Sequence, residues 1–356
     1  MNGVTYREWL IAFVIASSAT LSLQVPYALG YTLARPGLEF TGVIMNPEDS
    51  QSYFAKMLQG YDGRWLYTIP FTTEEHAPAF VGGFYLALGH LARTLGWSLE
   101  AMWLTARVVA DLLLFLAIFG FIAIFLQDLR ARWTAYLLAL FGSGLGWLLF
   151  LLSQPYWLDW FPVDFKMPEA HVFFAALTFP HVALGMALIL RVSGLSSRQQ
   201  AAGSRQQAVE LLYAIGAGLA NLALAIVYPF LIYLVALTVG IYWLYLVARA
   251  RRVLWRQAIT LAATFALPAP LVLYYASTLA TNAVYRAWDA QSITLSPPLP
   301  HYLVAYGVMV LLAVLLCRPL TTDRRPQIAD GGLRSVVGGQ ETSFLWVWVI
   351  AVALLV

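Results

Sequence analysis

Long apolar runs recur along this chain and constrain its fold more than any other feature. A membrane-spanning helix needs about 20 mostly apolar residues, and stretches of this kind follow one another from end to end. Of the 356 residues, 61% are hydrophobic and only 11% are charged, whereas soluble domains have about 25% charged residues. We therefore expect an all-α, polytopic membrane protein. The expected spans are 8–28, 100–126, 134–153, 171–191, 209–227, 229–248, 258–279 and 301–316.

The same composition excludes several classes of protein. The apolar excess argues against a soluble enzyme, and the basic residues are scattered, so nucleic acid is not an expected partner. The lone Cys317 cannot form an internal disulfide. The final run, Phe344–Val356, has 13 residues, which is about 20 Å of helix and too short to span. We therefore expect residues 1–356 to form a single transmembrane domain of a chain that is truncated at its C-terminus.

The distribution of charge predicts the orientation. Cytoplasmic loops collect Arg and Lys, and the loops beginning at residues 127, 192, 249 and 317 are rich in Arg. The N-terminus and these loops share the cytoplasmic side if segment 78–96 does not cross the membrane. A crossing 78–96 with the N-terminus outside also satisfies the charges, but it places 29–77 in the cytoplasm. We favour an interfacial or re-entrant 78–96, a first outer loop over 29–99, and an outside turn at Tyr228-Pro229.

The first outer loop contains a predicted amphipathic helix from Asn46 to Leu58. Its acidic residues, Glu48 and Asp49, fall in the first turn, where they complement the helix dipole. Apolar residues recur at helical spacing, so the helix is expected to lie on the membrane face and to hold Asp49 at the water–lipid boundary. Simple helix capping by Glu48 and Asp49 is the alternative. The apolar stripe consists of Tyr53, Phe54, Met57 and Leu58.

The second outer loop, 154–171, mixes aromatic residues with carboxylates. Aromatic faces stack on sugar rings, so this composition suits a carbohydrate site. An aromatic belt at the membrane interface would have the same composition. The carboxylates of this loop are Asp159, Asp164 and Glu169, and the spacing does not choose between them.

A longer order of motifs points to a known family. The run Glu74-Glu75-His76-Ala77-Pro78 leads into an apolar segment that ends at Leu95-Gly96, and Arg107 follows in the next span. Together with Asp49-Ser50-Gln51-Ser52-Tyr53, this order resembles the first luminal region of GT-C glycosyltransferases, and in particular the protein O-mannosyltransferases and lipid A aminoarabinose transferases. The resemblance covers residues 1–130 and extends to the rest by architecture alone.

The resemblance can be followed residue by residue. Asp49 stands at the Asp position of the family's acidic motif, and Tyr53 stands at its Tyr position. His76 and Pro78 stand where the family has a Lys-Pro-Pro run, and Leu95-Gly96 replaces Phe-Gly. The chain departs from the family in having Ser50 at the second acidic position and only one proline.

The resemblance implies a GT-C-like helical bundle in the cell membrane, with an active site on the outer (periplasmic or extracellular) face. It implies inverting transfer of a sugar from a polyprenyl-phosphate donor to the hydroxyl of an unidentified acceptor, with Asp49 as the general base. Some family members bridge carboxylate and phosphate with a divalent metal, although no spacing here requires one. The residues expected to bind substrate are Glu48, Tyr53, His76, Arg107, Asp159, Asp164, Lys166, Glu169, His171, His181 and Arg286.

Several interpretations remain open at this point. Arg107 and Asp111 are one turn apart, so they form either a structural ion pair or a site where Arg107 faces the donor phosphate. His181 is either a satisfied polar residue between helices or a donor toward substrate, and Pro180 before it should kink the helix. The alternative function is a transporter or flippase of a lipid-linked substrate. Such proteins tend to have inverted repeats, which this sequence does not show.

Overall fold

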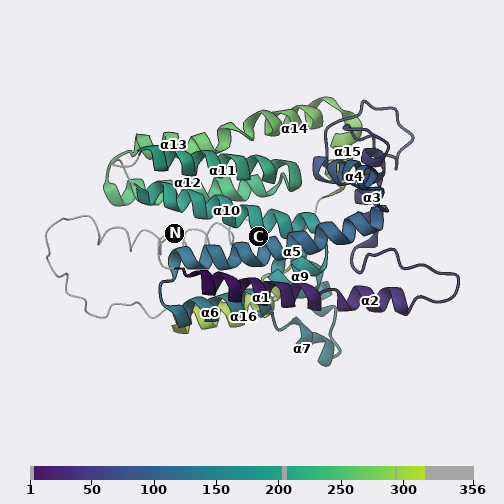
Figure 1. The fold of residues 1–356 in the computed structure, drawn as a ribbon, viewed down its shortest axis with the longest axis horizontal. Coiled ribbons are helices and arrows are strands. Elements are labelled where there is room, and N and C mark those ends of the chain that lie inside the picture. Colours follow the sequence, from purple (N-terminus) through teal and green to yellow (C-terminus); the bar gives the residue numbers. More distant parts are fainter. Residues whose placement is uncertain (1–3, 203–206, 293–294, 317–356) are drawn as a thin grey trace. The chain divides into compact units, whose positions relative to one another are not determined.

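A computed structural model describes residues 4–202, 207–292 and 295–316. Within these residues every regular element is a helix, and the only strand-like pairing is a bridge between Tyr67 and Ala79. The chain divides into two compact units, the first made of Met1–Phe121 with Ala176–Thr294 and the second of Ile122–Ala175 with Leu295–Val356. Figure 1 shows the helices, and each unit is described by itself.

The first unit contains most of the long helices. These are α1 (Tyr6–Ser22), α2 (Val25–Thr32), α3 (Pro47–Tyr61), α4 (Gly83–Leu95), α5 (Leu99–Phe125, ending in the second unit), α10 (Pro180–Ala202), α11 (Gln207–Val227), α12 (Leu231–Ala250), α13 (Trp255–Ala266), α14 (Ala269–Thr281) and α15 (Ala283–Gln291). The second unit contains α6 (Leu129–Phe141), α7 (Gly146–Leu151), η1 (Trp157–Asp159), α8 (Val163–Lys166), η2 (Pro168–Ala170) and α16 (Leu299–Leu316), and α9 (Val172–Leu177) lies at the boundary.

The apolar helices fit a membrane protein, but they give fewer spans than the sequence predicted. Among the described residues, three segments are long and apolar enough to cross a membrane: Tyr6–Thr32, α5 and α12. The pair α13 and α14 would add a fourth if it counts as one span, although it is bent by 59°. Three to four spans among the described residues are fewer than the eight that the sequence predicted.

Glycine and proline explain where the predicted spans break. In 134–153, α6 ends at Phe141 and α7 begins at Gly146; a Cβ on Gly144 would lie 2.6 Å from the Ala305 carbonyl oxygen, and one on Gly146 would lie 2.1 Å from Asp164 Oδ1. In 171–191, a new helix starts at Pro180, because proline fits the first helical turn but not the interior. The expected kink is thus a complete break.

Other predicted elements are confirmed. The amphipathic helix is α3, and the expected turn at Tyr228-Pro229 separates α11 from α12. Segment 78–96 contains α4, whose 13 residues span about 20 Å, so this helix is too short to cross and fits the interfacial interpretation. The run Phe344–Val356 and Cys317 lie outside the described residues.

Two apolar clusters stabilise the first unit. The larger cluster joins α10, α11, α12 and α13, whose small and branched side chains pack closely. The smaller cluster joins the segment between α3 and α4 to α15. The larger consists of Ile189, Val192, Ala217, Leu224, Ala225, Ile232, Val235, Val239 and Leu261, and the smaller of Tyr67, Ile69, Ala79, Leu86, Val284 and Tyr285.

The segments predicted to lie outside the membrane meet at one end of this unit. Figure 1 shows α3, α4 and α15 gathered beside the start of α5, on the right of the view. The Tyr228 ring of the predicted outside turn lies 4.9 Å from the His181 ring at the start of α10. Tyr85 of α4 contacts the same His181. Those segments of the first unit that were predicted to lie outside therefore lie together, while the membrane face that they occupy stays a prediction.

Candidate functional site

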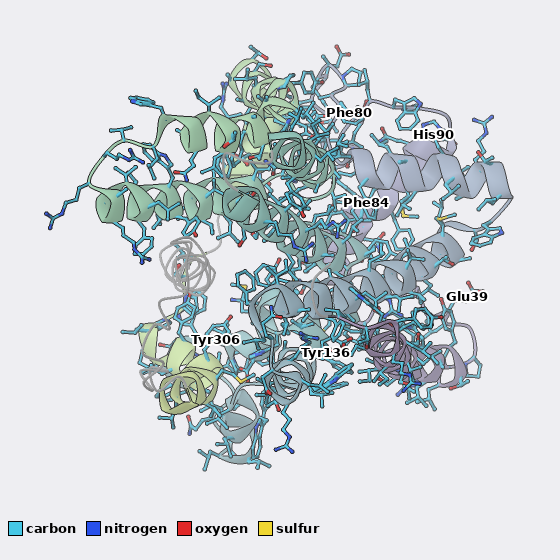
Figure 2. All side chains as sticks on the ribbon, turned by 60° about the vertical axis from the view of Figure 1, so that its left-hand side comes forward. Glu39, Phe80, Phe84, His90, Tyr136 and Tyr306 are labelled. Carbon is cyan, nitrogen blue, oxygen red and sulfur yellow. The ribbon has the colours of Figure 1, made fainter. Side chains whose placement is uncertain are left out.

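The site is built on the close packing of α3 against α4. Gly60 and Gly89 let the two helices approach each other to backbone contact. A Cβ on Gly60 would lie 2.1 Å from the Leu86 carbonyl oxygen, and one on Gly89 would lie 1.9 Å from the Met57 carbonyl oxygen. Any larger residue would separate the helices. Figure 2 labels Phe80 and Phe84 near the start of α4 and His90 farther along it.

The segment between α3 and α4 folds back over this pair. Tyr67 and Ala79 exchange two backbone hydrogen bonds of 2.8 and 3.0 Å. The Gln59 side chain donates to the Thr68 carbonyl oxygen and accepts from the Thr68 N–H. The Tyr285 hydroxyl of α15 donates to the Tyr67 carbonyl oxygen. These bonds fix the Tyr67 ring beside α3.

Lys56 lies inside this arrangement. Its side chain is only 3% exposed, and its ammonium is surrounded by aromatic faces. Nζ lies 5.1 Å from the ring centroids of Tyr53 and Tyr67 and 4.9 Å from that of Trp288. Burial lowers the pKa of Lys56 from 10.5 to about 8, against the opposing charge of Asp49. The cage compensates part of the lost hydration by cation–π attraction.

An aromatic cluster continues from the cage. The Tyr53 ring stacks on Tyr85 at 4.5 Å and lies 5.3 Å from Phe179. The Tyr85 hydroxyl and His181 Nδ1 are 2.7 Å apart in a buried hydrogen bond. His181 is therefore a polar residue that is hydrogen-bonded between helices, which is one of its two interpretations from the sequence. Tyr53, predicted to bind substrate, connects this cluster to Lys56.

The predicted base lies at the exposed end of α3. Asp49 and Glu48 are both exposed in its first turn. Asp49, Tyr53 and Lys56 are spaced at i, i+4 and i+7, so they share one face of the helix. The site thus has an exposed carboxylate, a half-buried aromatic ring and a buried cation in sequence along one helix.

His76 and Arg286, two of the predicted substrate ligands, make bonds within the fold. His76 Nε2 accepts from the Ile69 N–H at 3.0 Å, and Nδ1 lies 2.9 Å from the Glu74 carbonyl oxygen. Arg286, exposed on α15, donates from Nη1 to the Ala280 carbonyl oxygen at 2.9 Å. The His76 ring is thus held by two local bonds, which position the loop over α3.

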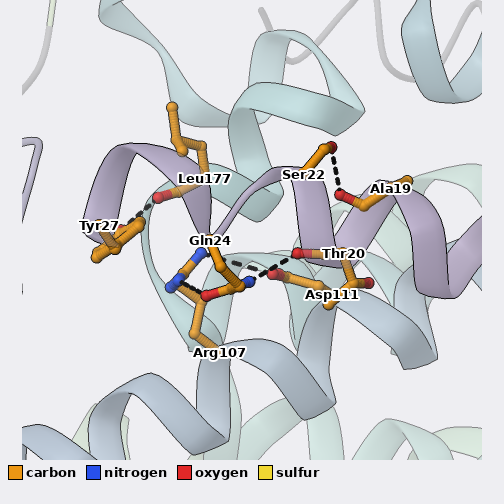
Figure 3. A network of polar contacts seen from close by, with 8 residues as sticks. All are labelled: Ala19, Thr20, Ser22, Gln24, Tyr27, Arg107, Asp111 and Leu177. Carbon is orange, nitrogen blue, oxygen red and sulfur yellow. Dashed lines mark hydrogen bonds and ion pairs between the residues drawn. The ribbon is translucent and has the colours of Figure 1, made fainter. Parts of the chain in front are cut away.

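Arg107 belongs to a separate buried network in the same unit (Figure 3). It is fully buried, its Nη1 lies 3.7 Å from Asp111 Oδ2, and its Nη2 donates to Gln24 Oε1. Its guanidinium carbon lies 3.6 Å over the Tyr27 ring, whose hydroxyl donates to the Leu177 carbonyl oxygen. This arrangement favours the structural ion pair over a role toward donor phosphate.

The remaining predicted residues lie in the second unit. Asp164 is buried, and its Oδ2 accepts from the Gly146 N–H at 2.8 Å, so it caps the start of α7. Asp159 and Glu169 are exposed. Lys166 Nζ lies 4.5 Å over the Trp160 ring, and the half-buried His171 ring lies 5.5 Å from Tyr306.

Backbone strain distinguishes Asp159 from the other carboxylates of its loop. Leu158 and Asp159 both have a positive φ, of 54° and 60°. Two successive non-glycine residues in this region are costly, and such strain concentrates at functional sites.

The part of the chain that the structure describes offers no ready site for a resident metal. Among the described residues, no group of three or more His, Cys, Asp or Glu side chains is arranged to hold a metal ion.

Lys56, Tyr67 and Trp288 were not expected from the sequence. One indication of Lys56 was present in the sequence, because it is one of only two lysines in the chain and lies seven residues after Asp49.

Comparisons with known proteins do not identify a family for this chain. No protein-family model, no curated protein and no solved structure matches this chain.

Proposed function

We propose that this chain is a membrane glycosyltransferase of GT-C type that transfers a sugar from a polyprenyl-phosphate donor to an acceptor hydroxyl on the outer face of the membrane. The motif order around Asp49 and Tyr53 supports the family. The observation that carries the proposal is the position of Asp49: an exposed carboxylate on the short amphipathic helix α3, at one end of the apolar helices.

This position suits the chemistry of a lipid-linked donor. The lipid tail stays in the bilayer, so the anomeric carbon must be reached at the interface. A helix lying at that depth presents Asp49 to water, from which the acceptor comes. The half-buried Tyr53 ring, one turn further along the same helix, is an aromatic group of the kind on which sugar rings stack.

The proposed reaction is one displacement. The acceptor oxygen attacks the anomeric carbon and forms the new glycosidic bond, while the bond from that carbon to the phosphate oxygen breaks. The acceptor proton passes to the Asp49 carboxylate. The electron pair of the broken bond stays on the leaving polyprenyl phosphate, whose added charge favours a nearby cation.

The test is to substitute the base. Asp49→Asn keeps the size of the side chain and removes its basicity, so sugar transfer should fall about 100-fold or more. The full-length protein is reconstituted in liposomes with a panel of radiolabelled polyprenyl-phosphate sugars, and products are counted after extraction. Asp62→Asn, at the exposed C-terminal end of the same helix, is the control and should retain normal transfer. Normal turnover by Asp49→Asn would reject Asp49 as the base.

The alternative function is a transporter or flippase of a lipid-linked substrate. One observation supports it, namely the bent pair α13 and α14. Broken helices are common at transporter binding sites, and this pair is bent by 59°. The same liposomes separate the two functions. Movement of the labelled donor across the bilayer without any transferred sugar would favour the transporter.

A further inference from the structure

The Lys56 ammonium is a buried cation that forms no salt bridge with any described residue. Only 3% of its residue surface is exposed, and three aromatic rings surround Nζ. Within the described residues, neither a hydrogen bond nor an ion pair of Lys56 is found. Aromatic faces attract a cation but offer no oxygen acceptor, so the hydrogen-bonding capacity of the ammonium is left for a ligand.

Tyr67 provides a second, independent observation. Its side chain is fully buried, and its hydroxyl has no hydrogen-bond partner. This is the same ring that lies 5.1 Å from Lys56 Nζ. Buried hydroxyls are nearly always satisfied in folded proteins, and an exception calls for an explanation. Two hydrogen-bond donors without acceptors therefore share one buried location.

The backbone beside Lys56 makes room for its stem and adds positive potential. Gly82 has a φ of +71°, and a Cβ there would lie 2.4 Å from Lys56 Cδ. Gly82 is the N-cap of α4 and supplies no side-chain cap. The positive end of this helix dipole therefore lies against the Lys56 side chain and favours an anion nearby.

We infer that Lys56 and the Tyr67 hydroxyl form a phosphate-binding site at the junction of α3, α4 and α15. A phosphate offers several acceptor oxygens and a negative charge, which together satisfy both donors. This inference rests on the proposed function in naming the phosphate as that of the lipid-linked donor. Asp49, Tyr53 and Lys56 then lie in order along α3 as base, sugar platform and phosphate cation.

The site would act most strongly on the leaving group. The donor is a phosphodiester with one negative charge, and the released polyprenyl phosphate is a monoester that gains a second. A cation fixed at this place stabilises the charge that develops as the bond breaks.

Direct binding tests the inference. The full-length protein in phosphatidylcholine nanodiscs is titrated with polyprenyl phosphate, and bound lipid is measured by native mass spectrometry. We expect Lys56→Met to weaken binding about 100-fold, as loss of a charge-assisted contact does. Tyr67→Phe should weaken it about tenfold. Arg93→Met, which removes an exposed cation from the last turn of α4, should change affinity less than about twofold.

Three further arms identify the ligand. Uncharged polyprenol should bind at least about 100-fold more weakly than polyprenyl phosphate, because it lacks the anion. Competition by millimolar inorganic phosphate would assign the site to phosphate in general, and its absence would assign it to the lipid. Equal binding of polyprenol and polyprenyl phosphate would overturn the inference.

Two results would leave Lys56 a purely structural cation: wild-type affinity in both Lys56→Met and Tyr67→Phe, or no phosphate binding by the wild type. If Lys56→Met fails to fold, the binding affinity of Tyr67→Phe is the deciding measurement. This variant removes only a hydroxyl oxygen that has no hydrogen-bond partner among the described residues. Phosphate binding without any sugar transfer would reject the proposed function and keep this site. If Asp49→Asn loses sugar transfer while Lys56→Met binds polyprenyl phosphate as the wild type does, the proposed function is kept and the phosphate site is rejected.

Discussion

His181 Nδ1 and the Tyr85 hydroxyl are 2.7 Å apart, and both side chains are buried. The bond joins the short helix α4 to the first turn of α10. It fixes the aromatic cluster around Tyr53 to a long helix of the same unit. Its loss should therefore be felt in the stability of the whole α3–α4 region.

Tyr85→Phe should destabilise the protein. The substitution leaves His181 Nδ1 without its partner in an apolar place, which costs about 1–3 kcal/mol. The measurement is the thermal unfolding midpoint in detergent. Tyr233→Phe, at a residue that is 64% exposed, is the control and should leave the midpoint unchanged. An unchanged midpoint in Tyr85→Phe would mean that the bond does not form.

Tyr67→Phe should behave in the opposite way. Because the Tyr67 hydroxyl is buried and has no partner, its removal relieves an unpaired group and should alter stability by less than about 0.5 kcal/mol or raise it. The same thermal unfolding assay, in the absence of phosphate and phospholipid monoesters, gives the result. A loss of more than about 1 kcal/mol would show that the hydroxyl is bonded within the fold.

The pKa of Lys56 predicts a pH dependence of stability. It falls from 10.5 to about 8 on folding, so the unfolded chain holds this proton more tightly. The free energy of unfolding should therefore rise with pH between about 8 and 10.5, by about 3 kcal/mol in total. The Asp49 charge opposes the shift, so removing it should enlarge the total rise and start it at a lower pH.

The comparison that isolates Lys56 is wild type against Lys56→Met. Burial raises the pKa of Tyr67 and raises that of Tyr285 to about 12, so both tyrosines reduce stability once the unfolded chain begins to lose its phenol protons. Unfolding is therefore measured between about pH 7 and 9.5, below that range. Equal slopes for the two proteins would contradict a buried, destabilised ammonium.

Gly89→Ala should separate α3 from α4. Its new Cβ would lie 1.9 Å from the Met57 carbonyl oxygen, and backbone cannot move aside cheaply, so we expect a loss of about 2–4 kcal/mol. Gly240→Ala is the matched control, because nothing lies within 4 Å of a Cβ on this glycine in α12. That change should stabilise the helix by up to about 1 kcal/mol. Equal midpoints for both variants would refute the close contact.

The Arg107–Asp111 pair should show strong coupling. Arg107→Leu leaves a buried carboxylate without its cation and should cost about 3–5 kcal/mol, while the double variant with Asp111→Leu should recover most of that loss. A double-mutant cycle on unfolding midpoints measures this coupling. Additive losses would mean that the two charges are satisfied separately.

The sequence predicted those elements whose signals are local. Pro47, the acidic first turn and the apolar stripe were enough to locate α3, and Pro229 located the turn after α11. The charges in the loops indicated a non-crossing 78–96, which the short α4 fits. The breaks in 134–153 and 258–279 were missed, because hydropathy does not distinguish a continuous helix from two short apolar ones.

The site could be predicted only in part, because its cation depends on long-range contacts. Lys56 falls on a helix where a lysine is usually solvated, and its burial comes from Tyr67 and from Trp288, which is more than two hundred residues away in the chain. Likewise, the sequence made Arg107 a plausible phosphate ligand, whereas in the structure its guanidinium contacts Gln24 and Tyr27. No local pattern reports such contacts.

The pairing of Arg107 with Asp111 inside a single helix has a consequence for biosynthesis. The Tyr27 hydroxyl bonds to a carbonyl 150 residues later, so this network cannot be completed while α5 is leaving the ribosome. Because its counter-ion is one turn away on the same helix, the arginine enters the translocon already neutralised. Insertion of α5 thus does not have to wait for the partners that later enclose it.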